Sequence, residues 1–193
     1  LANGLSAFGG SFQFLATSSL TYALTQSPFV TSLQMVVDRI PFVLFGRWAG
    51  RIVDRRDPRT VIVVASLLQA LLTTCYIIGH KNVAVIMLLN LVVSTFDVFT
   101  GPAQSALFPL FVEKHQLIKG NARKSSIMGI VQLFGPATAG WAIVRFGPTW
   151  AFVINAVTYL FPAIAMYLIK PVESVEKKRP LKHEETTEGA ESF

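Results

Sequence analysis

The side chains that could do chemistry in this sequence are charged residues that stand inside otherwise apolar segments. Asp97 lies in one such segment, and Asp38 and Arg39 lie in another. A charge at the centre of a bilayer costs about 2.5–3.5 kcal/mol, so it normally faces a cavity or a partner. Asp38 and Arg39 are adjacent and cannot face one another on a helix. We hypothesise that Asp97 or Asp38 takes up and releases a proton. The alternative is a buried structural pair, such as Arg39 with an acid on another helix.

Other kinds of site find little support in the sequence. Cys75 is the lone cysteine and lies inside an apolar run, so neither a disulfide framework nor zinc-ligand spacing is present. His80, His115 and His183 are far apart and have no acidic partner at metal-ligand spacing. We also find no nucleophile–base pair and no ATP-binding motif. The sequence therefore predicts no metal, no cofactor and no enzyme.

The elements that carry these charges are long and apolar. The chain has 193 residues, of which 52% are hydrophobic and 15% are charged, whereas soluble domains carry about 25% charged residues. Charged residues are absent from residues 1–37, 61–79, 125–144 and 148–169. Each run has roughly 19 residues or more, the length with which an α-helix crosses a hydrocarbon core of about 30 Å. The sequence predicts an all-α integral membrane protein.

Six transmembrane helices are predicted, over residues 5–24, 30–49, 60–78, 83 onward, 125–144 and 148–169. We expect Pro41 to kink the second, Gly101-Pro102 and Pro109 to break the fourth, and Gly135-Pro136 to interrupt the fifth. Charged loops are expected over 51–59 and 113–124. Residues 1–170 thus form one bundle. Residues 171–193 are polar and charged, and are expected to form a disordered cytoplasmic tail or central linker.

The positive charges indicate how the chain is oriented. Lys and Arg residues concentrate in the loops 51–59 and 113–124 and in the tail, whereas the opposite side carries only Lys81 and Arg145. By the positive-inside rule, both termini are cytoplasmic and the protein lies in the cell membrane. The net charge of +6 does not predict a nucleic-acid partner, because these residues fill short gaps and do not form a face with interleaved aromatics.

Helix-bending residues recur in corresponding segments. Pro41 and Pro136 lie within the second and fifth helices, and Gly9-Gly10 and Gly101-Pro102 lie in the first and fourth. Matching interruptions are typical of inverted repeats, whose interrupted helices line a substrate path. The alternative is that Gly and Pro are simply common in membrane helices.

The loop after the second helix carries a recognisable motif. Residues 50–59 read GRIVDRRDPR and resemble the Gly-x-x-x-Asp-Arg-x-Gly-Arg-Arg/Lys motif of the major facilitator superfamily. The residues that match are Gly50, Asp54, Arg55 and Arg59. Asp57 replaces a glycine, as in the branch of macrolide-efflux and enterobactin-exporter proteins, and Pro58 replaces an arginine. A charge-assisted cluster that forms in only one conformation would bias a two-state equilibrium and act as a gate. The alternative is that the arginines only hold the loop inside.

Two further segments extend the resemblance. Residues 101–109, GPAQSALFP, are similar to the Pro-Ala-x-x-Ala-x-x-Pro stretch of that branch, with Gln104 where arginine is frequent. Residues 135–140, GPATAG, are similar to the Gly-Pro-x-x-Gly-Gly antiporter motif of exporters, with Ala139 replacing one glycine. Gly135, Pro136 and Gly140 carry this likeness. A packing face of small residues would explain them nearly as well.

The resemblance implies the N-terminal half of a major facilitator fold, in which six helices form two inverted three-helix repeats. A second six-helix half would come from the same native chain or from another copy. It also implies proton-coupled efflux of a small amphipathic organic molecule, drug-like, macrolide-like or siderophore-like. The predicted cavity includes Phe12, Gln13, Gln34 and Phe96. The alternative is a non-transporting subunit or a degenerate half-transporter that docks a partner.

Overall fold

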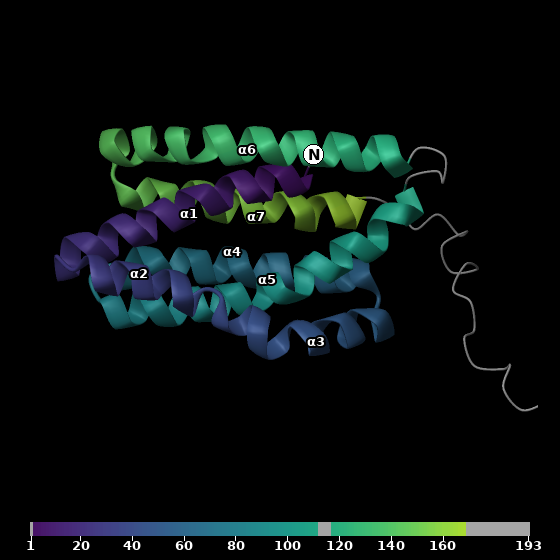
Figure 1. Ribbon diagram of the computed structural model, residues 1–193, viewed down its shortest axis with the longest axis horizontal. Coiled ribbons are helices and arrows are strands. Elements are labelled where there is room, and N and C mark those ends of the chain that lie inside the picture. The colour runs from purple at the N-terminus through teal and green to yellow at the C-terminus, as the bar shows by residue number, and fades with distance from the viewer. Residues whose placement is uncertain (1, 112–116, 169–193) are drawn as a thin grey trace, which may run out of the picture.

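The computed structural model describes residues 2–111 and 117–168, and helices make up nearly all of this part (Figure 1). No strand occurs among these residues. The helices are α1 (Ala2–Thr25), α2 (Pro28–Val37), α3 (Ile40–Arg55), α4 (Pro58–Gly79), α5 (Val83–Phe111), α6 (Leu117–Phe146) and α7 (Pro148–Leu168). The predicted tail, residues 171–193, lies outside the described residues.

Five helical segments are long and apolar enough to cross a membrane: α2 with α3, then α4, α5, α6 and α7. The remaining helix, α1, has 24 residues and is also long enough, but Ser, Thr and Gly make it less apolar. Many large apolar side chains are exposed, among them Val43, Ile78 and Val144, which are 83%, 86% and 89% exposed. Such a surface suits lipid and would be an aggregation liability in water. The prediction of an all-α membrane protein is confirmed.

Local sequence sets where the helices begin. Ser27 accepts a hydrogen bond from the Val30 N–H at 3.4 Å and caps α2, with Pro28 in its first turn. Proline is favoured at the first helical position because its missing N–H is not needed there. Gly147 has a φ of +88° between α6 and α7, a backbone conformation that glycine adopts at little cost.

The second predicted helix is in fact two helices. We expected one helix kinked at Pro41, but α2 ends at Val37 and α3 begins at Ile40. The Asp38 N–H still donates to the Gln34 carbonyl at 3.0 Å, whereas the Arg39 N–H donates to the Val36 carbonyl at 3.0 Å. The turn therefore tightens at Arg39. Pro41 then falls in the first turn of α3, where a proline disturbs no hydrogen bond.

Other predicted boundaries were wrong because the helices run further than the apolar segments. α3 continues to Arg55, and α6 already begins at Leu117, so most of the loop 51–59 and the second part of the loop 113–124 are helical. α5 continues through Gly101-Pro102 and α6 through Gly135-Pro136 without a break. A transmembrane helix keeps a proline when its neighbours and local adjustments compensate for the lost hydrogen bond.

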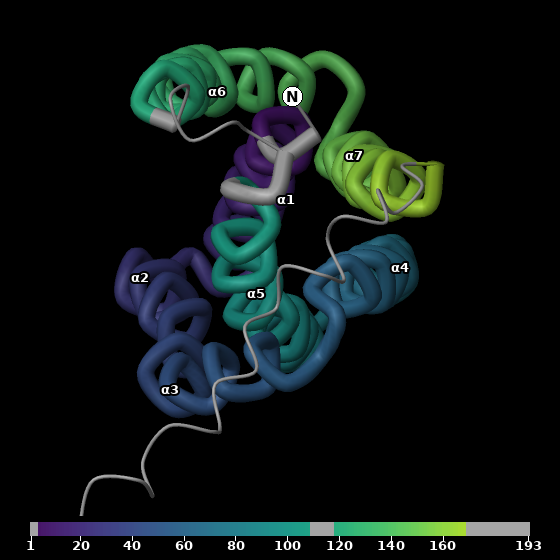
Figure 2. Tube along the Cα trace, turned by 90° about the vertical axis from the view of Figure 1, so that its right-hand side faces the viewer, coloured from purple at the N-terminus to yellow at the C-terminus, as the bar shows by residue number. Residues whose placement is uncertain are grey.

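The helices pack as two matching groups around a central pair. Viewed along the bundle, α1 and α5 lie in the middle (Figure 2). α1 packs against α6 and α7, while α5 packs against α3 and α4, and α4 packs against α7. Exchanging α1 with α5, α3 with α6 and α4 with α7 converts the contacts of α1 into those of α5 and leaves the contact between α4 and α7 unchanged. This pairing supports the predicted three-helix repeats.

One glycine permits a close contact at the centre of this bundle. A Cβ atom at Gly9 would lie 1.8 Å from Thr158 Oγ1 and 2.5 Å from Asn155 Oδ1. Only glycine therefore lets α1 approach α7 at this point. Nearby, the rings of Tyr76 and Phe152 stack with centroids 4.9 Å apart, and both side chains are fully buried.

Candidate functional site

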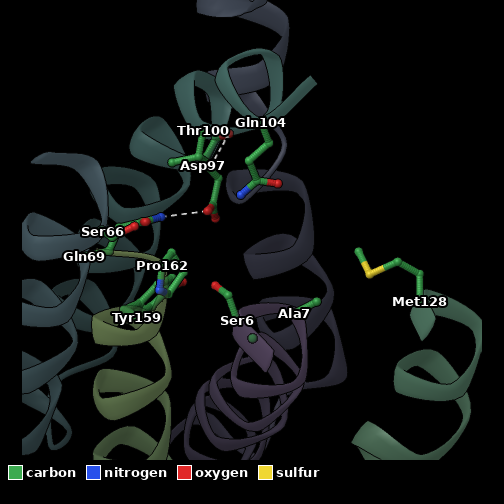
Figure 3. Close-up of a pocket in the computed structure, with 11 residues that line it drawn as sticks. Ser6, Ala7, Ser66, Gln69, Asp97, Thr100, Gln104, Met128, Tyr159 and Pro162 are labelled. Atoms are coloured by element: carbon green, nitrogen blue, oxygen red, sulfur yellow. Dashed lines mark hydrogen bonds between the residues drawn. The ribbon is translucent and has the colours of Figure 1, made fainter. Parts of the chain in front are cut away.

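A pocket of about 240 Å³, lined by both polar and apolar residues, lies in the bundle around Asp97 (Figure 3). Helices α1, α4, α5, α6 and α7 all contribute to it. Its lining residues are Ser6, Ala7, Gly10, Ser66, Gln69, Asp97, Thr100, Gln104, Met128, Tyr159 and Pro162. A predicted site residue, Asp97, thus meets several polar side chains that the sequence had not connected with it.

Gln69 holds the Asp97 carboxylate from the neighbouring helix. Gln69 Nε2 donates to Asp97 Oδ1 at 2.7 Å and also lies 3.4 Å from the Val93 carbonyl. Gln69 is only 1% exposed, so the donor of this hydrogen bond is buried. Among the described residues, Asp97 makes no ion pair and its Oδ2 atom accepts no hydrogen bond. Gln69 therefore fixes the position of the Asp97 carboxylate, but no cation among the described residues pairs with it.

Asp38 lies at the break between α2 and α3 and is half-buried. Its carboxylate interacts electrostatically with Arg39 and with Asp97. Two acids from distant parts of the sequence thus act on one another within the bundle. Arg39 is exposed and places its guanidinium carbon 5.9 Å from the centroid of the Phe42 ring. Within the described ranges, Arg39 forms no ion pair with an acid on another helix, so the suggested structural pair is absent there.

A buried hydrogen-bond network, which the sequence analysis missed, joins four helices through Gln13. Gln13 Oε1 accepts from Thr73 Oγ1 at 3.4 Å and from Asn155 Nδ2. Gln13 Nε2 donates to the Tyr76 hydroxyl at 3.4 Å, and that hydroxyl donates to Asn90 Oδ1. The network links α1, α4, α5 and α7. Hydrogen bonds between buried amides and hydroxyls rigidify a bundle, although Asn90 Nδ2 itself has no partner among the described residues.

A second set of hydrogen bonds fixes α2 against α1. Gln34 is completely buried. Its Nε2 donates to Thr17 Oγ1, and its Oε1 accepts from Thr21 Oγ1, both at 2.7 Å. The sequence held a signal for both networks, because Gln13, Thr17 and Thr21 recur every four residues on an apolar helix. Residues at this spacing share one face.

The predicted substrate-cavity residues do not gather at one place. Phe12, Gln13 and Gln34 are buried between helices, and Phe96 is half-buried. None of the four lines the pocket around Asp97. Their contact with a substrate stays a prediction.

Asp57 has a clear structural role in the motif 50–59. It caps α4, since its Oδ1 accepts the Arg59 N–H at 3.2 Å and its Oδ2 accepts the Thr60 hydroxyl at 3.0 Å. Pro58 follows in the first turn. Asp-Pro is a favourable start for a helix, which explains why this pair can replace the Gly-Arg of the family pattern.

Arg59 joins the beginning of α4 to the end of α7. Its Nη2 donates to the Met166 carbonyl at 2.9 Å, in the last turn of α7. A cation is favourable there because the helix dipole leaves negative charge at the C-terminus. Asp54 and Arg55 lie exposed near the end of α3, and Asp54 has an interaction of its own. Whether these residues gate transport stays a prediction.

Only part of the Gly-Pro motifs packs within the bundle. A Cβ atom at Gly135 would lie 2.6 Å from Ser11 Oγ, and Ala139, one turn on, is fully buried. These two positions let α6 approach α1. In contrast, a Cβ at Gly50, Gly101 or Gly140 would meet nothing within 4 Å among the described residues. Pro136 is exposed and Pro102 is half-buried.

The chain matches a protein-family pattern over nearly its whole length and several known proteins over part of it. The Major Facilitator Superfamily pattern matches residues 1–192. Macrolide efflux protein A of Streptococcus pyogenes is 29% identical over 119 residues, which is 60% of this chain and 29% of the relative. Macrolide efflux protein A of Enterococcus faecalis is 30% identical over 104 residues, 52% of this chain and 32% of the relative. The uncharacterized MFS-type transporter YfiS of Bacillus subtilis strain 168 is 25% identical over 166 residues, 86% of this chain and 40% of the relative.

No solved structure gives a significant match. The matched segments cover between 29% and 40% of these relatives, so the chain spans less than half of their length. The loop motif, the packing of the helices and the matched pattern agree. The chain is a multi-pass membrane protein that belongs to the Major Facilitator Superfamily.

Proposed function

We propose that this chain is part of a proton-coupled secondary transporter that exports a small amphipathic organic molecule by alternating access. The observation that carries the proposal is the Asp97 carboxylate, which is held in mid-helix by Gln69 and has no cationic partner in the described part of the chain. A membrane acid without a counter-ion is suited to bind and release a proton. Asp38 is the second candidate, since it interacts with Asp97.

The substrate class rests on the relatives. Two of those reported above are named macrolide efflux proteins, which favours a macrolide-like or other drug-like substrate, with a siderophore-like molecule as the further candidate of the same class. The pocket around Asp97 is about 240 Å³, whereas sites for drug-sized ligands occupy about 300–1,000 Å³. We therefore place the organic substrate outside this pocket, against the faces of α1, α2, α5 and α6.

A second six-helix half, from the same native chain or another copy, completes the transporter in this proposal. Gly50, Gly101 and Gly140 meet no neighbour among the described residues, and small residues let a further helix approach closely. The protein would lie in the cell membrane with both termini cytoplasmic, as the distribution of Lys and Arg favours. It would act as a carrier and catalyse no covalent reaction.

Export assays in drug-sensitive bacteria test the proposal. The native protein should lower the accumulation of a labelled macrolide, and a protonophore should abolish the effect. We expect Asp97→Asn to reduce proton-driven export at least tenfold, whereas Asp97→Glu, which keeps a carboxylate, should retain part of it. Unchanged export by Asp97→Asn would reject Asp97 as the coupling acid. Correct membrane insertion without any export would instead favour a subunit that docks a partner.

A further inference from the structure

The pocket around Asp97 extends towards one end of the bundle only. Asp97 is the central residue of the 29-residue helix α5. Gln104 lies seven residues further along, about 10 Å nearer the end of α5 at 1.5 Å per residue. Ser6 approaches from the beginning of α1, and both helix ends lie at the same end of the bundle (Figure 1). By the charge distribution this is the cytoplasmic end.

Polar groups in this pocket lack partners within the protein. Within residues 2–111 and 117–168, the side chains of Ser6, Ser66 and Gln104 make no hydrogen bond, and neither does Asp97 Oδ2. Ser66 is only 3% exposed, yet it lines the pocket. Figure 3 shows Asp97, Gln104 and Ser6 directed towards a common space. Ser6, Asp97 and Gln104 are half-buried, and polar groups without protein partners that line a pocket are normally hydrated.

The volume of the pocket indicates which molecules it can hold. A volume of about 240 Å³ has room for several water molecules, each of which takes about 30 Å³ in the liquid. It is small for a drug-sized molecule. Water in contact with Asp97 Oδ2 would allow this carboxylate to exchange protons.

Towards the opposite end the bundle is closed by the Gln13 network. Thr73 and Tyr76 lie one and two turns beyond Gln69 on α4, and Asn90 lies two turns from Asp97 on α5. Their side chains are bonded to one another or to Gln13. Tyr76 and Phe152 stack in the same layer and are fully buried. Asn90 Nδ2 is buried without a partner among the described residues, but no residue of this layer lines the pocket. We therefore infer that the pocket opens towards the cytoplasmic end.

We propose that the pocket between α1, α4, α5, α6 and α7 is a water-filled passage through which Asp97 exchanges protons with the cytoplasm, inside this six-helix unit and separate from the path of the organic substrate. The inference rests on the proposed function. The titratable groups that interact with Asp97 from neighbouring elements are Asp38, Tyr76 and Tyr159. Arg39 acts on Asp38.

Cysteine accessibility tests the passage in the native protein. Cys75 is the sole cysteine of this chain, so Cys75→Ser provides the background, with any cysteine elsewhere in the native protein also replaced. Single cysteines are placed in the pocket by Ser66→Cys, Thr100→Cys and Gln104→Cys. Asn90→Cys, in the closed layer, is the matched control. Each variant is treated with a small, positively charged, membrane-impermeant methanethiosulfonate in inside-out vesicles.

We expect the pocket cysteines to react from the cytoplasmic side at least tenfold faster than Asn90→Cys. Two pocket positions that react no faster than Asn90→Cys would overturn the passage. Thr100→Cys keeps the test decisive if Ser66→Cys fails to insert. In right-side-out cells Gln104→Cys should not react, and its labelling there would also overturn the passage. Cysteine labelling does not depend on transport, so slow labelling of the pocket positions would reject the passage alone. Export that is insensitive to a protonophore would instead reject the proposed function.

Discussion

Arg59 Nη2 donates to the carbonyl oxygen of Met166 at 2.9 Å, and this contact joins residues 107 positions apart in the sequence. The arginine belongs to the loop motif that resembles the family pattern, and its partner is a backbone atom in the last turn of α7. Arg59 Nε is buried and has no partner among the described residues. Within this chain the motif therefore has a structural function, because it joins the start of α4 to the end of α7, in addition to any role in gating.

Replacing Arg59 by Ala should destabilise the protein. A hydrogen bond that involves a charged group contributes about 1.5–3 kcal/mol, and the α7 carbonyl would lose its donor. We expect a lower melting temperature in detergent and faster proteolysis after α7. Arg56→Ala is the matched control, because Arg56 is exposed, and it should change stability by less than about 0.5 kcal/mol. Equal effects of the two variants would show that the Met166 contact contributes little.

Substitutions at Asp57 separate helix capping from gating. Asp57→Ala removes the acceptor of two hydrogen bonds at the start of α4, and the loss of such a cap costs about 0.5–2 kcal/mol. Asp57→Asn keeps a good cap but removes the charge. If capping is the role, Asp57→Asn should retain both stability and export, as measured by thermal unfolding and macrolide accumulation. A stable Asp57→Asn protein that no longer exports would instead assign Asp57 to the gate.

Much of the fold could be predicted from the sequence because membrane helices need long uncharged runs. The run 60–78 is close to α4, and 148–169 is close to α7. Hydropathy marks only the part of a helix that lies in lipid, however. It could not show that α3 extends to Arg55 or that α6 begins at Leu117, because charged residues continue a helix into water without loss.

The break at Asp38 and the polar networks were harder to foresee. The break arises because the Arg39 N–H donates to the Val36 carbonyl. The identity of residue 39 does not determine which carbonyl accepts this hydrogen bond. Gln13 stands out in an apolar helix, but its partner Asn155 is 142 residues away and is brought close only by the packing of α1 on α7. Asp97 was singled out from its type and depth alone. Its donor Gln69 could not be named without the contact between α4 and α5.

Adjacent glycines on α1 provide a test of helix packing. Gly9→Ala would place a Cβ atom 1.8 Å from Thr158 Oγ1 and should force α1 away from α7, whereas the same change at Gly10 meets nothing within 4 Å. Overpacking a bundle typically costs about 1–3 kcal/mol. Gly10→Ala should be neutral or stabilise the helix by up to about 1 kcal/mol. Thermal unfolding in detergent measures both. Equal melting temperatures for the two variants would contradict this packing of α1 on α7.

The Gln13 network should be the most sensitive polar element of the bundle. Gln13→Leu leaves the Thr73 and Asn155 donors without their acceptor and removes the donor to Tyr76. Each buried polar group that loses its partner costs about 1–3 kcal/mol, so we expect a loss of several degrees in melting temperature and lower yield in the membrane. Gln132→Leu is the control, since Gln132 is exposed on α6 and an apolar side chain is tolerated at a lipid-facing position. A Gln13→Leu protein as stable as wild type would contradict this expectation and show that the network contributes little free energy to folding.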